Sequence, residues 1–360
     1  MKFGAIKYME WAKTEPGKAG INLGRSGFPA FPIKDLNLNF SELEISGEHS
    51  FGYPPLLKAL SRHLGVKEES VLTTFGASQA VFYVCAALLA KGDEVLIEKP
   101  AYEPLLAVPA ALEAKINRLE RGFDSRYQLD PDRFEAALTK RTRLVILTNP
   151  HNPSGVLSEP SRLRELVAIA EKRGVMVLID EIYLEFQEEK DRQTAFSLGP
   201  NVVIASSLTK VFGLAGLRCG WLLAPVSLVR KIHQLRDHIN VEEVFIGEQI
   251  SAQLIPQLDV LRKKIRPFVE QNRSLVKNFV EGEEKLSWVE PDPGLICFPR
   301  IETGLDGDQF IQHLLGEYDT VVVPGRFFEE PRHFRLGYGI PSQLLSRGLD
   351  NIREALRRAS

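Results

Sequence analysis

The chain has 360 residues, of which 44% are hydrophobic, 26% charged and 9% aromatic, so it can bury a large core and should form more than one compact domain. Its formal net charge is −2 and its Lys and Arg residues are scattered along the chain. This pattern argues against a nucleic-acid or anionic-membrane surface, and it favours small molecules or a second copy of the chain as partners.

The N-terminal stretch MKFGAIKYMEWAKTEPGKAG carries Glu10 and Glu15 and lacks the continuous apolar run of a signal peptide. No apolar run approaches the roughly 20 residues of a membrane span. We therefore expect a cytoplasmic protein. The first 45 residues are rich in loop signals such as EPGKAG and GRSGFPAFP, which do not reveal the domain that they join.

Short apolar runs alternate with helical patterns between about residues 70 and 225. The predicted strands are 93–100, 143–150, 174–181, 201–207 and 218–225, and one of the helices between them is predicted at 161–174. The runs are continuously apolar, which is typical of strands that are buried on both faces of a mostly parallel sheet. The sequence therefore predicts an α/β domain in which helices flank this sheet.

The pattern changes after residue 240. A long amphipathic stretch runs from about Glu248 to Val280, and Pro256 and Pro267 should kink or interrupt it. We interpret this stretch as a helical bridge to a second domain.

The C-terminal third predicts a smaller α+β unit. Its strand patterns lie at 294–301, 319–325 and 333–339, and its helical patterns lie at 307–318 and 342–359. We expect a large domain over residues 46–250. Residues 1–45 and 251–360 are expected to form the small domain, which includes the bridging helix.

Chemically functional side chains follow the ends of three predicted strands. Asp180 ends one strand with Tyr183 three residues later, Asn152 lies in TNPHNPSG after another, and Ser207 and Lys210 follow a third. Ligands of open α/β sheets bind outside the carboxyl ends of the strands. Each residue also has a structural interpretation, because Asp180 could cap a helix, TNPHNPSG could form a turn and Tyr183 could pack in the core.

Together these residues fit pyridoxal phosphate. This cofactor requires an amine for its aldehyde, a carboxylate at its ring nitrogen, donors to its phenolate oxygen, an aromatic face and an anion cradle. The candidates for these tasks, in the same order, are Lys210, Asp180, Asn152 with Tyr183, Tyr102, and the helix start at Gly76, Ala77 and Ser78 with Ser207 and Arg218. Free N–H groups and the positive dipole of a helix start suit a phosphate.

The chain resembles the fold-type I pyridoxal-phosphate aminotransferases of class I/II. The matching segments are TNPHNPSG, VLIDEIY, SSLTKVFGLAGLRCGW and FRLGYG, which keep the family's order from about Leu23 to the C-terminus. The resemblance implies an aspartate-aminotransferase-like fold, in which the large α/β domain binds the cofactor beside a smaller α+β domain. It also implies the cofactor contacts: an imine at Lys210, Asp180 at the ring nitrogen, Asn152 and Tyr183 at the phenolate oxygen, Tyr102 on the ring, and Ala77, Ser78, Ser207 and Arg218 at the phosphate.

The resemblance assigns further residues and shows two departures. Arg335 in HFRLGYG matches the family's arginine for the substrate α-carboxylate, which a bidentate guanidinium suits well. Family members commonly use a tyrosine to reach the partner subunit's phosphate, but Gly47 stands at that position, and His49 is the candidate to replace it. NLGRSGFPAFP replaces the family's usual loop over the substrate, so Gly24 and Arg25 are predicted to influence specificity.

The activity implied by the resemblance is transamination between an amino acid and a 2-keto acid by a homodimer. Lys210 would remove the Cα proton and return it to C4′ of the cofactor. A carbon–sulfur lyase, a cyclising synthase and a decarboxylase share the same cofactor motifs and stay open, as does a non-catalytic cofactor-binding sensor. The three cysteines indicate neither a disulfide framework nor a metal site. The sequence shows no obvious second cation that could bind a substrate side chain. This absence predicts a preference for amino acids with neutral or mixed side chains over aspartate.

Overall fold

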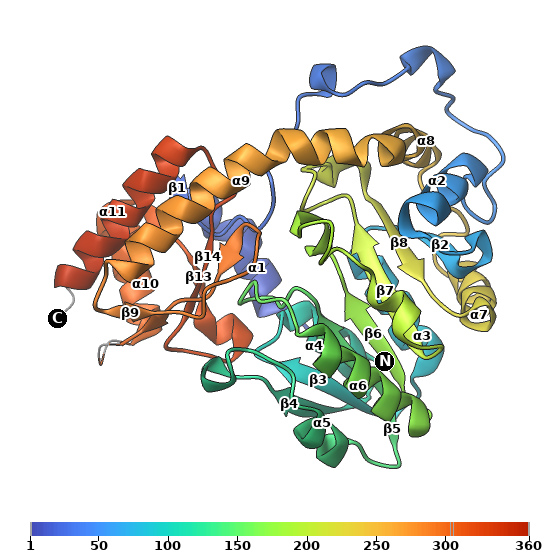
Figure 1. Cartoon of the computed structure of the whole chain (residues 1–360), viewed down its shortest axis with the longest axis horizontal. Coiled ribbons are helices and arrows are strands. Elements are labelled where there is room, and N and C mark those ends of the chain that lie inside the picture. Colours follow the sequence, from blue (N-terminus) through green and yellow to red (C-terminus); the bar gives the residue numbers. More distant parts are fainter. Residues whose placement is uncertain (1, 303, 305, 359–360) are drawn as a thin grey trace.

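A seven-stranded sheet forms the centre of the large domain in the computed structural model, which describes residues 2–302, 304 and 306–358 (Figure 1). The strand order is β2-β8-β7-β6-β5-β3-β4. The bounds are β2 (Val71–Phe75), β3 (Glu94–Lys99), β4 (Lys115–Glu120), β5 (Thr142–Thr148), β6 (Met176–Asp180), β7 (Val202–Ser207) and β8 (Cys219–Leu223). Only β8 runs antiparallel to its neighbours, so the prediction of a mostly parallel sheet is confirmed.

The five strands predicted from apolar runs are all present, but β2 and β4 were not predicted. The sequence of β2 is VLTTF, whose two threonines break the apolar run. The sequence of β4 is KINRLE, an edge strand that is largely exposed and polar. Neither strand therefore carries the continuous apolar signal of a strand that is buried on both faces.

Helices cover both faces of the sheet, and alternate strand residues face opposite layers. In β5, Leu144 and Ile146 pack in one cluster, whereas Val145 and Leu147 pack in the other. The first layer includes α3 (Ala77–Leu88), α4 (Glu103–Ala111) and α7 (Val226–Arg236), and the second includes α2 (Pro54–Leu64), α5 (Pro131–Ala137), α6 (Pro160–Lys172) and α8 (Phe245–Leu254). This two-sided burial is the reason that the strands are apolar at consecutive positions.

The bridge between the domains is α9 (Leu258–Glu281), which runs from α8 to the small domain in Figure 1. Pro256 lies in the short 3-10 turn Ile255–Gln257 that separates α8 from α9, so it interrupts the amphipathic stretch as predicted. The helix α9 continues through Pro267, which does not interrupt it. The buried face of α9, which includes Leu261, Ile265 and Val269, offsets the lost backbone hydrogen bond.

The small domain packs short strands against α10 (Gly307–Tyr318) and α11 (Ser342–Arg358). Its strands are β1 (Ile21–Asn22), β9 (Leu286–Ser287), β10 (Ile296–Cys297), β11 (Arg300–Ile301), β12 (Thr320–Val321), β13 (Val323–Pro324) and β14 (Phe334–Gly337). Because β1 pairs in parallel with β12 in a two-stranded sheet, part of the N-terminal segment joins these strands. The domain limits given above stay a prediction.

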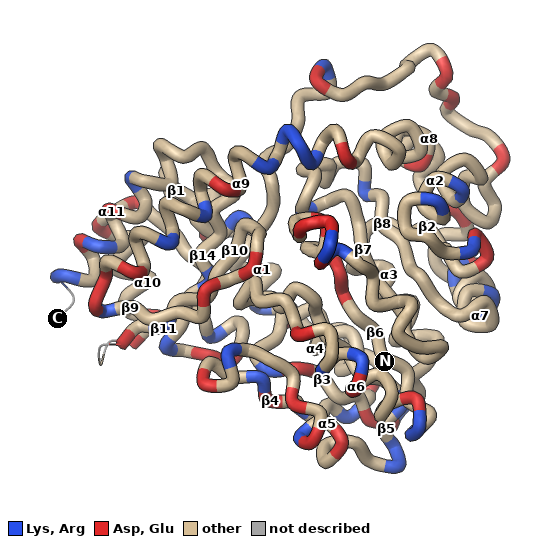
Figure 2. The backbone as a smooth tube through the Cα atoms, in the orientation of Figure 1, with Lys and Arg blue, Asp and Glu red and all other residues tan. Residues whose placement is uncertain are grey.

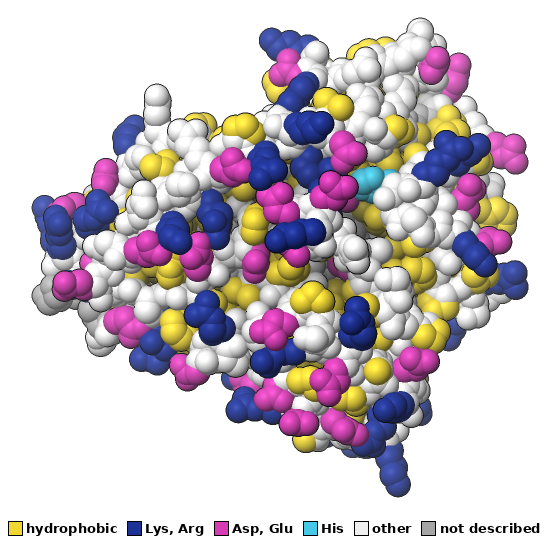
Figure 3. Space-filling model, in the orientation of Figure 1, with side chains coloured by type: hydrophobic (Ala, Val, Ile, Leu, Met, Phe, Trp, Pro, Cys, Tyr) yellow, Lys and Arg dark blue, Asp and Glu magenta, His cyan; other side chains and the backbone are white. Residues whose placement is uncertain are grey.

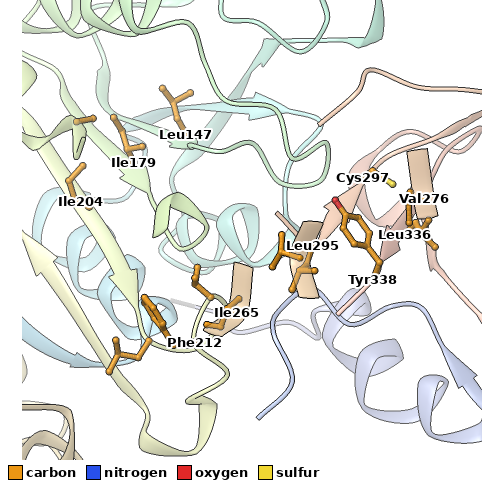
Figure 4. Packing of buried hydrophobic residues seen from close by; sticks show 14 of the residues in the cluster. Leu147, Ile179, Ile204, Phe212, Ile265, Val276, Leu295, Cys297, Leu336 and Tyr338 are labelled. Carbon is orange, nitrogen blue, oxygen red and sulfur yellow. The ribbon is translucent and has the colours of Figure 1, made fainter. Parts of the chain in front are cut away.

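One hydrophobic cluster extends through both domains. Figure 4 shows Leu147, Ile179 and Ile204 of the large sheet, Ile265 of α9, and Tyr338 beyond β14, all of which belong to this cluster. Packing along α9 therefore joins the two sheets through continuous apolar contact.

The surface and the cysteines agree with the composition. Figure 2 shows Lys and Arg interspersed with Asp and Glu over the whole backbone. Cys85, Cys219 and Cys297 are buried free thiols. No helix within the described residues is long and apolar enough to cross a membrane.

A buried ion pair lies at the ends of two neighbouring strands. Arg121 Nη1 donates to Glu98 Oε2 at 2.6 Å, and both side chains are fully buried. Glu98 Oε1 also accepts hydrogen bonds from the backbone and hydroxyl of Thr148, at 2.8 and 2.5 Å. Arg121 donates in addition to the Tyr127 carbonyl and the Ser158 hydroxyl. The pair therefore ties β3 and the end of β4 to the end of β5.

We expect Arg121→Met to lower the free energy of unfolding by about 3–5 kcal/mol, because Glu98 would stay buried without its cation. Arg173→Met is the matched control, since the Arg173–Glu135 pair is half-exposed and should contribute less than about 1 kcal/mol. Equilibrium urea unfolding of both variants measures the difference. Equal losses in the two variants would contradict this interpretation.

Candidate active site

The predicted site residues meet at the carboxyl ends of β5, β6 and β7. Thr148 at the end of β5 pairs with Asp180, and Asp180 pairs with Ala205 of β7, so the three strands end side by side. Lys210 follows β7 and Asn152 follows β5. Parallel pairing therefore brings these residues together although the sequence separates them.

Lys210 lies at the centre of this arrangement. Its Nζ donates to Ser26 Oγ at 3.1 Å, and Ser26 also forms a side-chain hydrogen bond with Tyr183. Burial lowers the pKa of Lys210 to about 8, with help from the positive charges of Arg335 and Arg218, while Asp180 acts in the opposite direction. Near neutral pH the neutral, nucleophilic form of the amine is therefore far more populated than in an ordinary lysine.

Asp180 is a buried carboxyl group without an ion-pair partner in the described part of the chain. Its Oδ1 accepts the Ile182 N–H at 3.0 Å, so it has a local backbone contact as well. Burial raises the pKa of Asp180 to about 7, although that hydrogen bond and the charge of Lys210 lower it. A cationic ring nitrogen beside the carboxylate would keep it ionised.

Asn152 is positioned by the buried ion pair beneath it. Its backbone N–H donates to Thr148 Oγ1 at 2.8 Å, and this hydroxyl in turn donates to Glu98. The side-chain Oδ1 accepts from Arg335 Nη1 at 3.0 Å. The Nδ2 group has no acceptor among the residues that the structure describes, so it is available to donate to a ligand oxygen.

Two tyrosines border the site. Tyr183 is buried, and burial raises the pKa of its phenol to about 12, so it is a hydrogen-bond donor at neutral pH. Tyr102 lies at the start of α4, its hydroxyl contacts Met9 Sδ at 3.5 Å, and its ring meets that of Tyr8 edge to face with centroids 5.2 Å apart.

The start of α3 forms an anion cradle together with Arg218. Gly76 has φ +78°, and a Cβ there would lie 2.6 Å from Arg218 Nη2. In the described part of the chain, the backbone N–H groups of Ala77 and Ser78 have no acceptor, and Arg218 bonds only to carbonyl oxygens. Ser207 is buried at the end of β7. This set of donors without a counter-anion fits a phosphate group.

Arg335 on β14 is a buried guanidinium, only 1% exposed. Its Nη1 donates to Asn152, while its Nη2 donates to Tyr8 Oη at 2.9 Å and more weakly to the Gly24 carbonyl at 3.5 Å. It forms no ion pair with any described residue, and its Nε has no partner. A buried guanidinium with only neutral partners is suited to an anionic ligand such as a carboxylate.

The N-terminal residues of the site have different environments. Gly24 contacts Arg335 through its carbonyl, whereas the side chain of Arg25 is exposed and its backbone packs against Gly337. His49 is buried, and its ring nitrogens contact the carbonyls of Gly47 and Glu243 at 2.9 and 3.1 Å. Both ring nitrogens of this histidine therefore have partners within the same chain, and its role at a partner subunit's phosphate stays a prediction.

Two residues in contact with the site were not among the predicted site residues. They are Ser26, which contacts Lys210, and Tyr8 of α1 (Lys7–Thr14), which contacts Arg335. Ser26 was noted only as part of the altered loop NLGRSGFPAFP. Tyr8 lies in no motif, and its only sequence signal is an aromatic residue in a short amphipathic stretch.

A separate groove with a cavity of about 540 Å³ lies between residues 185–192 and α9. Its lining carries both acidic and basic side chains, and several of them pair with one another, including Glu185 with Arg262 and Glu188 with Arg266. Figure 3 shows mixed charges over the face of the molecule that includes α9. Arg262 and Arg266 of this groove therefore have acidic partners, unlike Arg218 and Arg335 in the candidate site.

Comparison with known proteins agrees with this geometry. The family model of aminotransferase class I and II matches residues 21–352. Capreomycidine synthase from Streptomyces vinaceus is 30% identical over 288 residues, covering 79% of this chain and 74% of the relative. Aspartate aminotransferase from Pyrococcus horikoshii is 25% identical over 324 residues, covering 85% and 81%. The crystal structure of a PLP-dependent aminotransferase from Streptococcus suis superposes with a TM-score of 0.94 at 24% identity, covering 100% and 99%.

The lowered pKa of Lys210 predicts the pH dependence of cofactor capture. Cofactor-free protein should take up pyridoxal phosphate at a rate that rises with pH and levels off above about pH 8, because only the neutral amine attacks an aldehyde. Stopped-flow absorbance of the lysine-bound cofactor measures this rate. Arg335→Gln should move the midpoint to higher pH, since Arg335 is one of the cations that lower this pKa. A wild-type midpoint near that of an ordinary lysine would show that the amine is not desolvated.

Proposed function

The chain belongs to the aminotransferase class I and II family, and from this premise we propose that it transfers an amino group from an amino acid to a 2-keto acid. Its cofactor is pyridoxal 5′-phosphate, as in the family. One observation supports the proposal most directly: the Lys210 amine and the buried Arg335 guanidinium lie in the same site. No acidic side chain of the described residues neutralises the guanidinium. One group suits the cofactor aldehyde, and the other suits the α-carboxylate of an amino acid.

Each residue has a definite task in this proposal. When bound, the cofactor supplies an aldehyde and a ring that withdraws electrons from the substrate Cα. Lys210 Nζ would hold the cofactor through its aldehyde, and its amine is the group that would move a proton at the substrate Cα. Asp180 would keep the ring nitrogen protonated, and Arg335 would orient the α-carboxylate.

The remaining predicted contacts hold the cofactor in place. Asn152 Nδ2 and the Tyr183 hydroxyl would donate to the phenolate oxygen, and Tyr102 would pack on the ring. The cradle of Ala77, Ser78, Ser207 and Arg218 would hold the phosphate. The free N–H groups at the start of α3 and the absence of an acidic partner for Arg218 in the described residues support this assignment.

A second reaction, cyclisation by a synthase, is the main alternative. The relative that is 30% identical is named capreomycidine synthase, whereas several relatives that are 24–26% identical are named aspartate aminotransferases. Cleavage of a carbon–sulfur bond and decarboxylation use the same cofactor contacts. The reactions differ in the bond at Cα or Cβ that breaks, which the residues around the cofactor do not determine.

We also propose a homodimer with an active site close to its interface. Large apolar side chains are exposed beside the phosphate cradle, where Phe75 and Val244 line the same small cavity as Arg218. Elsewhere in the described chain, the exposed large apolar side chains include Ile45, Phe51, Ile239, Val241 and Ile246. A set of this kind favours a protein–protein contact. Neutral or mixed side chains are the expected substrates, since Lys210, Arg218 and Arg335 are assigned to the cofactor and the α-carboxylate, and the side chain of Arg25 is exposed.

Product analysis tests the proposed function directly. The loaded enzyme is incubated with single amino acids, and mass spectrometry identifies the products before and after a 2-keto acid is added. Transamination predicts release of the matching keto acid, loss of the visible absorbance of the cofactor, and recovery of that absorbance when the second keto acid is added. A cyclic amino acid formed without keto-acid release would establish the cyclising synthase instead, and release of CO₂ would establish a decarboxylase.

A further inference from the structure

Tyr8 lies inside the candidate site although it belongs to the N-terminal helix α1. Its hydroxyl oxygen accepts a hydrogen bond from Arg335 Nη2 at 2.9 Å, and the residue is only 8% exposed. Three rings from two other segments enclose it, with centroid distances of 5.2 Å to Tyr102, 5.7 Å to Phe327 and 6.1 Å to Phe328. The phenol is therefore fixed in place beside the guanidinium.

The backbone of Tyr8 is anchored by Glu103. The carboxylate of Glu103 accepts the N–H of Tyr8 at 2.6 Å and the N–H of Lys7 at 3.2 Å. The N-cap residue of α1, Ile6, has no side chain that can cap the helix, so Glu103 caps it from another element. Because Glu103 directly follows Tyr102, one short segment positions both the residue expected on the cofactor ring and the helix that carries Tyr8.

The hydrogen bonds around Tyr8 leave one donor unused. The hydroxyl oxygen of Tyr8 accepts from Arg335, but its own hydrogen has no acceptor within the described residues. Arg335 likewise has only neutral partners, and its Nε has none. An anionic oxygen that approaches Arg335 Nη2 would also be close enough to accept a hydrogen bond from the phenol.

We propose that Tyr8 is a second substrate-binding group, whose phenol O–H donates to the same α-carboxylate that Arg335 binds. This inference rests on the proposed function in that the α-carboxylate belongs to an amino-acid substrate. It gives α1 a direct role in substrate binding, since the helix delivers the donor and Glu103 fixes its position.

Tyr127 provides a matched control for a purely structural role of Tyr8. It lies in the same aromatic cluster, is 1% exposed, and its hydroxyl has no hydrogen-bond partner. Tyr127→Phe therefore removes one buried phenol oxygen from that cluster without removing a contact of Arg335. Tyr8→Phe removes the same atom but keeps the ring packing.

The first experiment titrates loaded wild-type, Tyr8→Phe and Tyr127→Phe enzymes with carboxylates that lack an amino group, from propanoate to 4-methylpentanoate. Binding is followed by calorimetry, and the corresponding amides are titrated alongside. A hydrogen bond to a charged group corresponds to a loss of about tenfold or more in affinity. We expect that loss for carboxylates in Tyr8→Phe only, with amide binding unchanged.

The second readout separates substrate binding from catalysis. Tyr8→Phe should raise KM for the amino acid about tenfold and change kcat less than about threefold, because a uniform binding contact is removed. Equal carboxylate affinity in wild type and Tyr8→Phe, or an equal loss in Tyr127→Phe, would overturn the proposal, as would a wild type that binds no carboxylate. A wild type that binds carboxylates but releases no keto acid would refute transamination alone, and the titration would still decide the role of Tyr8.

Discussion

The buried ion pair between Glu98 and Arg121 supports the polar groups of the site. Glu98 accepts the Thr148 hydroxyl, Thr148 accepts the backbone N–H of Asn152, and Asn152 accepts from Arg335. The pair itself is fully buried, so each of its hydrogen bonds offsets part of the cost of taking two charges out of water. This chain of contacts connects the carboxyl end of β3 in the large domain with β14 in the small domain. The position of the guanidinium therefore depends on a charge pair that cannot itself touch a substrate.

The positively charged groups of the site lack anionic partners among the described residues. Burial shifts Lys210 and Asp180 toward their neutral forms, with pKa values of about 8 and about 7. Arg335 and Arg218 keep their charges without an acidic partner in the described part of the chain. A phosphate at the start of α3, a protonated ring at Asp180 and a carboxylate at Arg335 would each supply the missing opposite charge. One ligand pair, the cofactor and an amino acid, thus satisfies all of these groups together.

The sequence predicts most of this arrangement because its signals are local. Continuous apolar runs mark the strands that are buried on both faces, and the motif residues follow directly after them, as for Asp180 after β6. The strands β2 and β4 lack that signal, and α9 continues through Pro267 because its buried face outweighs the local preference of proline. Tyr8 could not be predicted, since its partner Arg335 is 327 positions away and only the tertiary fold brings the two together.

The proposed chemistry depends on Lys210 as the amine that holds the cofactor. Reduction of the loaded enzyme with borohydride, followed by proteolysis and mass spectrometry, fixes the cofactor to its lysine and identifies the position. We expect the label on Lys210 in the peptide that contains SSLTKVFGLAG, and no label in Lys210→Ala. A label on any other lysine would contradict this assignment.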